Sequence, residues 1–169
     1  MDRIINILKT LDRPGTDKVI EFMQESNYDK ASCYKHHKYK GGLVDHSLEV
    51  YDRMMSRRGK LPVSSIIIGA FFHDIGKAHK RGMSLSGPHE QRSIQILDSC
   101  GFALTERERK AIVNHHKKSS DYMTCPLRHC LSKSDMDSTR EWLEANDPNH
   151  NSSLAKILKN FGLKILSKL

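Results

Sequence analysis

Residues 65–77 read SIIIGAFFHDIGK, an apolar run that ends in a histidine, an aspartate and a glycine. The run is too short to span a membrane, so it predicts a buried helix that begins at Ser64 or Ser65. Gly76 is a suitable terminator just past this helix. The sequence therefore predicts that the His-Asp pair lies at the end of a buried helix.

Glycine and proline also mark the ends of helices in the rest of the chain. Glycine and proline divide it into about eight helical stretches, and strand alternation is scarce. Thr105 and Glu108 are spaced as a capping box at the start of one of these helices. We therefore predict an all-α, single-domain helical bundle over residues 1–169. Its expected parts are an N-terminal helical pair at 1–28, a core at about 30–145 and a C-terminal amphipathic helix at 152–169.

Length and composition agree with one domain outside the membrane. A chain of 169 residues with 37% hydrophobic content is long enough for a packed core. It has no apolar run of roughly 18 residues, and its N-terminus lacks the features of a secretory signal. The four cysteines have no disulfide-framework spacing, and the group Cys125, His129 and Cys130 lacks a second pair at zinc-finger spacing. We expect a cytoplasmic protein with free thiols and no membrane partner.

The net charge of +8 is spread along the chain, which favours an anionic ligand. A solvated basic surface without a partner is the alternative, because net charge acts on solubility before function. The chain also holds ten histidines, most of them in short local clusters. The search for a site therefore begins with the histidines.

Four residues on three predicted helices can form a metal site. His73 and Asp74 supply a nitrogen and an anionic oxygen, a mixture that suits Mn, Fe, Co or Zn better than Mg or Ca. His46 lies on the apolar stripe of an earlier helix, and Asp135 lies on a later one. Asp135 is preferred to Asp137 because it shares an apolar helix face, whereas Asp137 points roughly 200° around the helix.

Two blocks of this sequence resemble the HD-domain superfamily of metal-dependent phosphohydrolases. The first is YKHHKYKGGLVDHSLEV at residues 34–50, and the second is FHDIGK at residues 72–77. The resemblance covers roughly residues 30–140. This region is similar to the HD module of bacterial 3'-to-5' exoribonucleases and of small phage-type HD hydrolases. It implies an HD-type helical fold and a divalent metal centre.

Three further histidines occupy the order seen in binuclear HD enzymes: His89, His115 and His116. The resemblance implies that one ion is held by His46, His73, Asp74 and Asp135, and that Asp74 bridges to a second ion held by those three histidines. Alternatively, they contact substrate or support the ligands in a one-metal site. On a regular helix, adjacent residues point about 100° apart, so His115 and His116 can face one centre only if the helix end is distorted.

Lys77 matches the lysine that follows the His-Asp pair in the family, which implies a substrate contact beside the catalytic Asp74. Three residues past a metal ligand, a lysine lies near the mouth of a pocket, where phosphate benefits from a cationic donor. His37, Lys40 and Arg92 are further candidates for binding substrate. The alternative for these three residues is an ordinary surface charge.

The sequence thus predicts an enzyme that hydrolyses a phosphate ester or phosphodiester of a nucleotide, including a cyclic or signalling nucleotide, by metal-activated water. One alternative is a 3'-5' exonuclease acting on short nucleic-acid ends, although no strand-rich oligonucleotide-binding module accompanies the helices. Another is a catalytically idle HD module that binds nucleic acid. The expected partners are a nucleotide or short nucleic-acid substrate, and the final helix offers an interface for a homo-oligomer.

Overall fold

The computed structural model describes residues 1–117 and 125–147, and all regular structure in these ranges is helical. The elements are α1 (Asp2–Leu8), α2 (Thr16–Glu25), α3 (Gly42–Arg57), α4 (Val63–Phe72), the 3-10 turn η1 (Ile75–Lys77), α5 (His89–Ser99), α6 (Glu106–Asn114) and α7 (Pro126–Asn146). The predicted all-α, single-domain fold is confirmed. The helix predicted at 152–169 lies outside the described residues.

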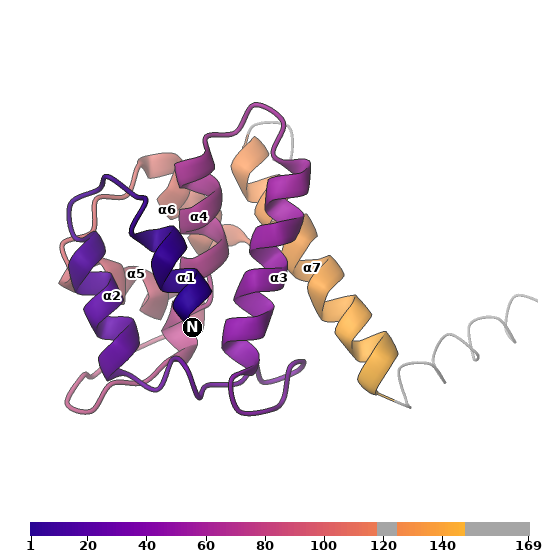
Figure 1. Ribbon diagram of the computed structural model, residues 1–169, viewed down its shortest axis with the longest axis horizontal. Coiled ribbons are helices and arrows are strands. Elements are labelled where there is room, and N and C mark those ends of the chain that lie inside the picture. The colour runs from indigo at the N-terminus through magenta and orange to yellow at the C-terminus, as the bar shows by residue number, and fades with distance from the viewer. Residues whose placement is uncertain (118–124, 148–169) are drawn as a thin grey trace, which may run out of the picture.

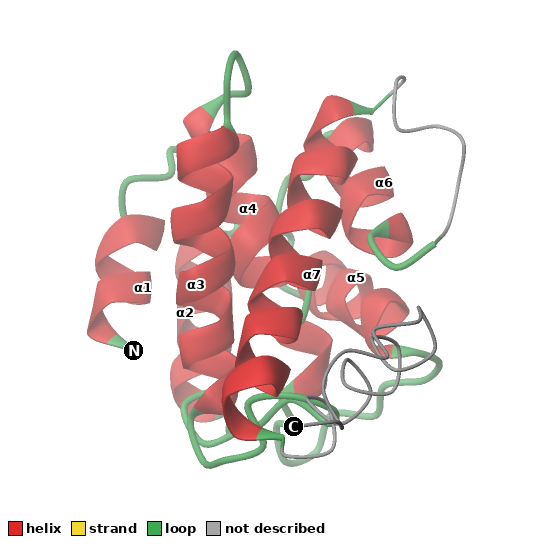
Figure 2. Cartoon of the chain, turned by 90° about the vertical axis from the view of Figure 1, so that its right-hand side faces the viewer, coloured by secondary structure: helices red, strands yellow, loops and turns green. Residues whose placement is uncertain are grey.

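The centre of the bundle is α4, which packs against α3, α6 and α7 and also contacts α1 (Figures 1 and 2). Every residue from Ile66 to Phe72 is buried. A helix that is apolar on all sides is stable only when other elements surround it, which is the position that α4 takes. None of the helices in the described ranges is long and apolar enough to span a membrane.

Two glycines at the start of α3 hold the preceding loop close to the bundle. Gly41 has a φ of 89°, a conformation that side chains with a Cβ rarely adopt. A Cβ on Gly42 would lie 2.0 Å from the carbonyl oxygen of His37, so only glycine allows this approach. The loop at residues 34–40 is therefore pressed against the N-terminal turns of α3, where His46 lies.

Several helices end or begin where the predicted ligands stand. The helix predicted to run through the His-Asp pair stops slightly earlier: α4 ends at Phe72, and His73 is its C-cap. Helix α5 begins at His89, and α6 ends at Asn114 with His115 as its C-cap. The predicted capping box of Thr105 and Glu108 is confirmed at the start of α6. Helix termini thus bring histidines from distant parts of the chain to one place.

Candidate metal centre

The structure gathers all seven predicted ligands into one cluster in the interior of the bundle. They come from α3, α7, the start of α5, the α4–η1 junction and the two residues that follow α6. The members are His46, His73, Asp74, His89, His115, His116 and Asp135. Most of these side chains are buried, whereas that of His116 is 47% exposed and that of His89 is 18% exposed. The cluster therefore has a buried side and a side that reaches solvent.

The buried side is centred on Nε2 of His46. This atom lies 3.3 Å from Nε2 of His73, 3.2 Å from Oδ1 of Asp135 and 3.7 Å from Oδ2 of Asp74. Ligand atoms of His46, His73 and Asp135 all lie within 4.8 Å of one another. Two nitrogens and two carboxylates at this spacing form a set suited to a transition metal.

Hydrogen bonds orient the imidazole rings toward the cluster. Nδ1 of His73 donates to the carbonyl of Ala70 at 3.0 Å, and Nδ1 of His115 donates to the carbonyl of Ile112 at 2.6 Å. Nδ1 of His46 lies 3.0 Å from Oγ of Ser138, whose hydroxyl donates to Glu49. Because Nδ1 carries the proton in each ring, Nε2 presents a lone pair to the cluster.

The more open side contains His89, His115, His116 and one residue that the sequence analysis missed, Glu90. Their ligand atoms lie within 4.8 Å of one another. The rings of His115 and His116 have centroids 4.0 Å apart, and both residues follow the last residue of α6. The pair thus stands at the end of α6 rather than inside it, and ligand atoms of both residues belong to one set. Glu90 was detectable only by its position next to His89.

Buried polar atoms without a hydrogen bond mark the junction between the two sides. Oδ1 of Asp74, Nε2 of His89 and Nε2 of His115 have no hydrogen-bond partner among the described residues. Asp74 Oδ1 and His89 Nε2 are only 3.0 Å apart but lack hydrogen-bond geometry. Buried polar groups are rarely left unsatisfied because their desolvation is costly. This donor set therefore fits a bound divalent cation that would satisfy these atoms.

The protonation states of the cluster also suit metal binding. Burial lowers the pKa of His73 to about 4 and that of His115 to about 3, so both rings are neutral near pH 7. Burial alone would raise the pKa of Asp74, but the neighbouring His73 and Lys77 outweigh it and hold this pKa well below its usual range. Neutral imidazoles and ionised carboxylates are the forms that bind metal, so little proton release opposes binding.

A cavity of about 470 Å³ opens beside the cluster. It is lined by Tyr34, Lys35, His36, Lys77, His89, His116 and Thr139. The ammonium group of Lys77 pairs with Oδ2 of Asp74, and this side chain is only 7% exposed. The pairing with Asp74 raises the pKa of Lys77 although burial acts to lower it. Lys77 thus carries a positive charge between the cluster and the cavity.

The other three predicted substrate-binding residues do not line this cavity. His37 has no exposed surface, its ring stacks on Trp142, and its nitrogens face His36 and Glu49. A substrate contact by His37 therefore stays a prediction, and in this structure its ring has no exposed surface through which to make one. Lys40 is exposed and Arg92 is partly buried, and both lie outside the lining. The lining residues that sequence reasoning missed are Thr139 on α7 and Tyr34, Lys35 and His36 in the segment at residues 34–50.

Asp137, the rival to Asp135, takes part in a different interaction. Its carboxylate lies 2.8 Å from Arg57, 3.2 Å from Lys133 and 2.9 Å from Arg140. Asp135 instead lies among His46, His73 and His116. Two positions along one helix therefore separate a member of the cluster from a carboxylate that neutralises surface cations.

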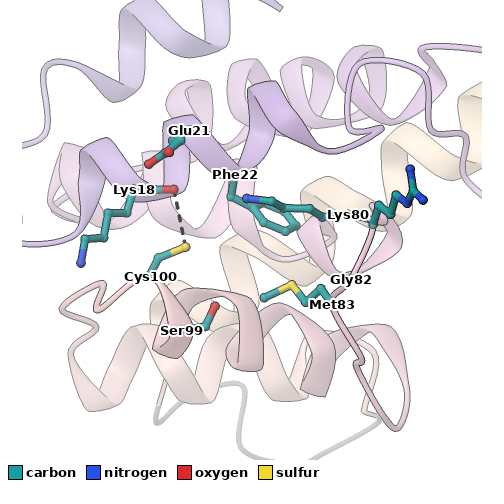
Figure 3. A pocket seen from close by; sticks show the side chains of 9 residues that line it. Lys18, Glu21, Phe22, Lys80, Gly82, Met83, Ser99 and Cys100 are labelled. Atoms are coloured by element: carbon teal, nitrogen blue, oxygen red, sulfur yellow. Dashed lines mark hydrogen bonds between the residues drawn. The ribbon is translucent and has the colours of Figure 1, made fainter.

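A separate cavity of about 390 Å³ lies between α2, α5 and the loop after η1 (Figure 3). Its wall combines Lys18, Glu21 and Lys80 with the apolar side chains of Phe22 and Met83. The thiol of Cys100 faces the carbonyl of Lys18 at 3.6 Å. None of the seven predicted ligands lines this cavity, so it is not an entrance to the cluster.

Comparison with known proteins gives one match. A family model described as HD domain matches residues 43–162, most of the chain. No curated protein and no solved structure matches. HD domains bind divalent metals and are generally metal-dependent hydrolases, in agreement with the His and Asp cluster. On the extent of this match, the chain belongs to the HD domain family.

Proposed function

We propose that this protein is a metal-dependent phosphohydrolase that cleaves a phosphate ester or phosphodiester of a nucleotide. One observation carries the proposal. Lone pairs of three oriented imidazoles and two ionised carboxylates converge in the interior beside an open cavity, and two of these atoms, Oδ1 of Asp74 and Nε2 of His115, have no hydrogen bond among the described residues. An HD module without catalysis has no need for such a costly arrangement.

The residues divide into two sets around Asp74. His46, His73, Asp74 and Asp135 would hold one ion. The second oxygen of Asp74 faces His89, which together with His115 and His116 would hold another, and Glu90 is an additional ligand candidate. Bound Mn, Fe, Co or Zn would supply Lewis acidity that activates water and neutralises charge on phosphoryl oxygens.

The side chains along the cavity wall can bind and orient the phosphoryl group. Lys77 presents its ammonium group next to Asp74, and Lys35 adds a second cation on the same wall. Charge-assisted bonds from these lysines would hold phosphate oxygens toward the cluster. His36 also lines the cavity; burial lowers its pKa to about 3, so its ring is neutral near pH 7 and can hydrogen-bond a substrate without adding charge.

Tyr34 supports a nucleotide as the substrate. Its side chain is 72% exposed although it is a large aromatic group, and it stands on the cavity wall next to Lys35. An exposed ring next to phosphate-binding cations offers a surface on which a base can stack. Burial of the ring against a base would also remove the cost of exposing it to water.

A metal-supplemented screen tests the proposal. The purified protein is assayed with Mn, Co, Fe, Zn and Mg against mononucleotides, cyclic nucleotides, dinucleotides and short RNA or DNA. We expect hydrolysis of at least one nucleotide, and none by an Asp74→Ala variant. Release of single nucleotides from strand ends would instead support the exonuclease alternative. Absence of hydrolysis with every metal and substrate, in a protein that binds metal, would overturn the proposed activity.

Metal stoichiometry tests the division into two sets. In the double variant His115→Ala, His116→Ala, elemental analysis should find one ion per chain if the wild type holds two. An unchanged single ion with lost catalysis would rule out the binuclear centre and leave both histidines as substrate-binding groups. Substitution of the exposed His129, which is not part of the cluster, is the matched control.

A further inference from the structure

We propose that a basic groove at the opposite end of α4 from the metal cluster binds the phosphate backbone of a nucleic acid. The groove consists of two cavities, of about 690 and 300 Å³, which share Leu61, Pro62, Arg107 and Pro126. Because four residues line both cavities, the two lie side by side, and we treat them together as the basic groove. Its volume exceeds that of the cavity beside the metal cluster.

The charges along the basic groove are of one sign. Six lysine or arginine side chains line it, and no lining residue is acidic: the cations are Arg13, Arg57, Arg58, Lys60, Arg107 and Lys133. By contrast, the cavity in Figure 3 is lined by an acidic residue, Glu21, as well as by cations. A concave surface lined by one sign of charge concentrates ions of the opposite sign.

Carboxylates of the protein neutralise only some of these six cations, so the others are available to bind an anion. Arg13 pairs with Glu108, and Arg57 and Lys133 share Asp137. No carboxylate among the described residues forms an ion pair with the other three: Arg58, Lys60 and Arg107. All three side chains are exposed. They can therefore meet phosphates without breaking a contact that holds the fold.

Three helices also begin at the basic groove. The N-caps of α4, α6 and α7 are Pro62, Thr105 and Cys125, and all three residues line the smaller cavity. The N-caps of α4 and α7 make no side-chain capping bond. Helix N-termini carry partial positive charge and free N–H groups, so their convergence adds to the attraction for phosphate.

The distribution of the cations favours a polymer over a single small anion. They come from the loop after α1, the end of α3, the loop after it, α6 and α7, and all but Arg13 are well exposed to solvent, with Arg57 at 37% and Lys133 at 51%. A site for one small phosphate group would instead surround it with buried, convergent donors. Solvated cations spread along a groove are typical of contacts to a phosphate backbone.

The basic groove is distinct from the metal cluster. Pro62 stands at the N-terminal end of α4, and His73 stands at its C-terminal end, ten helical residues away. At 1.5 Å per residue, the ten residues of α4 separate the two sites by about 15 Å along this helix. Binding in the basic groove therefore does not require that the cluster hydrolyse phosphate. The proposal for the groove and the proposed hydrolytic function can be refuted independently of each other.

Oligonucleotide binding at varied salt tests the proposal. Fluorescence anisotropy is measured with labelled 20-nucleotide RNA and DNA, single-stranded and duplex, in EDTA so that the strands stay intact. The variant is Arg58→Gln, Lys60→Gln, Arg107→Gln. For single strands we expect its affinity to fall on the order of tenfold or more, and the slope of log K against log salt to decrease by about 2.

A matched variant controls for net charge. The exposed Lys9, Lys30 and Lys38 line neither cavity of the basic groove, and changing all three to Gln removes the same charge. It should bind oligonucleotide nearly as wild type does, and circular dichroism should find both variants folded. Equal loss in both variants, or no loss in the groove variant, would overturn the proposal. So would complete displacement of the strand by a nucleoside triphosphate at equal phosphate concentration, because the basic groove would then be a small-anion site.

Discussion

Two buried carboxylates in this molecule have opposite surroundings. Glu108 is 1% exposed, and its oxygens meet Arg13 at 2.8 and 3.0 Å, Ser65 at 2.7 Å and the backbone N–H of Thr105 at 2.8 Å. Asp74 is also 1% exposed. Lys77 pairs with one of its oxygens, but the other faces His89 without a hydrogen bond.

The difference separates a structural carboxylate from one available for binding. The partners of Glu108 outweigh the effect of burial and lower its pKa, so it stays ionised and connects the start of α6 to Arg13 and α4. Asp74 keeps a lone pair on Oδ1 to which none of the described residues donates a hydrogen bond. A buried polar atom left without a partner costs free energy that a ligand can recover. The comparison can be tested by equivalent changes at the two sites.

The largest effect is expected from Asp74→Asn compared with Glu108→Gln. Each change removes one carboxylate charge and keeps the shape of the side chain. We expect Asp74→Asn to lower kcat/KM about 1,000-fold, or about 4 kcal/mol of barrier, because a metal ligand is lost. Glu108→Gln should keep wild-type kcat/KM below its unfolding temperature. Steady-state kinetics check this, and near-normal hydrolysis by Asp74→Asn would remove Asp74 from the centre.

Of these two carboxylates, only Asp74 should link metal binding to the stability of the protein. With Mn at 100 times its Kd, the free energy of unfolding of the wild type should exceed that of the chelated protein by about 2.7 kcal/mol, because the metal binds only the folded state. Glu108→Gln should show the same gain, and Asp74→Asn little or none. Urea unfolding with and without metal measures the difference. A full gain in Asp74→Asn would indicate that the ions bind elsewhere.

Glu108→Gln should destabilise the protein by about 2 kcal/mol near pH 7, the usual scale for a lost hydrogen bond to a charged group. The pKa of Glu108 is lowered from 4.5 by folding. Its contribution is therefore complete above pH 4.5 and is lost as the pH falls through the lower folded-state pKa. The stability difference between wild type and variant should shrink correspondingly in urea unfolding at low pH. A difference that grows on acidification would contradict this assignment.

A smaller effect is expected from Ser138→Ala. The Ser138 hydroxyl lies between Nδ1 of His46 and Glu49, and it keeps the His46 ring oriented. Without it, metal affinity should fall about tenfold, the lower end of the range for groups that support ligands. Titration with Mn or Co measures the change. Ser99→Ala, which removes a hydroxyl that donates to the carbonyl of Ile96 in α5, is the control and should leave metal affinity unchanged.

Much of the metal cluster was predictable from the sequence because its residues lie on helices or at their ends. The 3.6-residue period distinguishes Asp135 from Asp137, and the structure finds the first in the cluster and the second among surface cations. Periodicity gave no such guidance for His37, which stands in the loop before α3. A loop has no period, so adjacent residues such as His36 and His37 could not be assigned to the cavity or to the interior.

By itself, the sequence determined the helical class, the capping box of α6 and a set of candidate ligands, because these depend on local periodicity and residue chemistry. Tertiary structure decided which side chains face the cavity. The close approach of the loop to Gly42 buries His37 and leaves Tyr34, Lys35 and His36 on the cavity wall. The basic groove likewise has no sequence signature, since its cations come from separate segments that meet only when α3, α6 and α7 pack around α4.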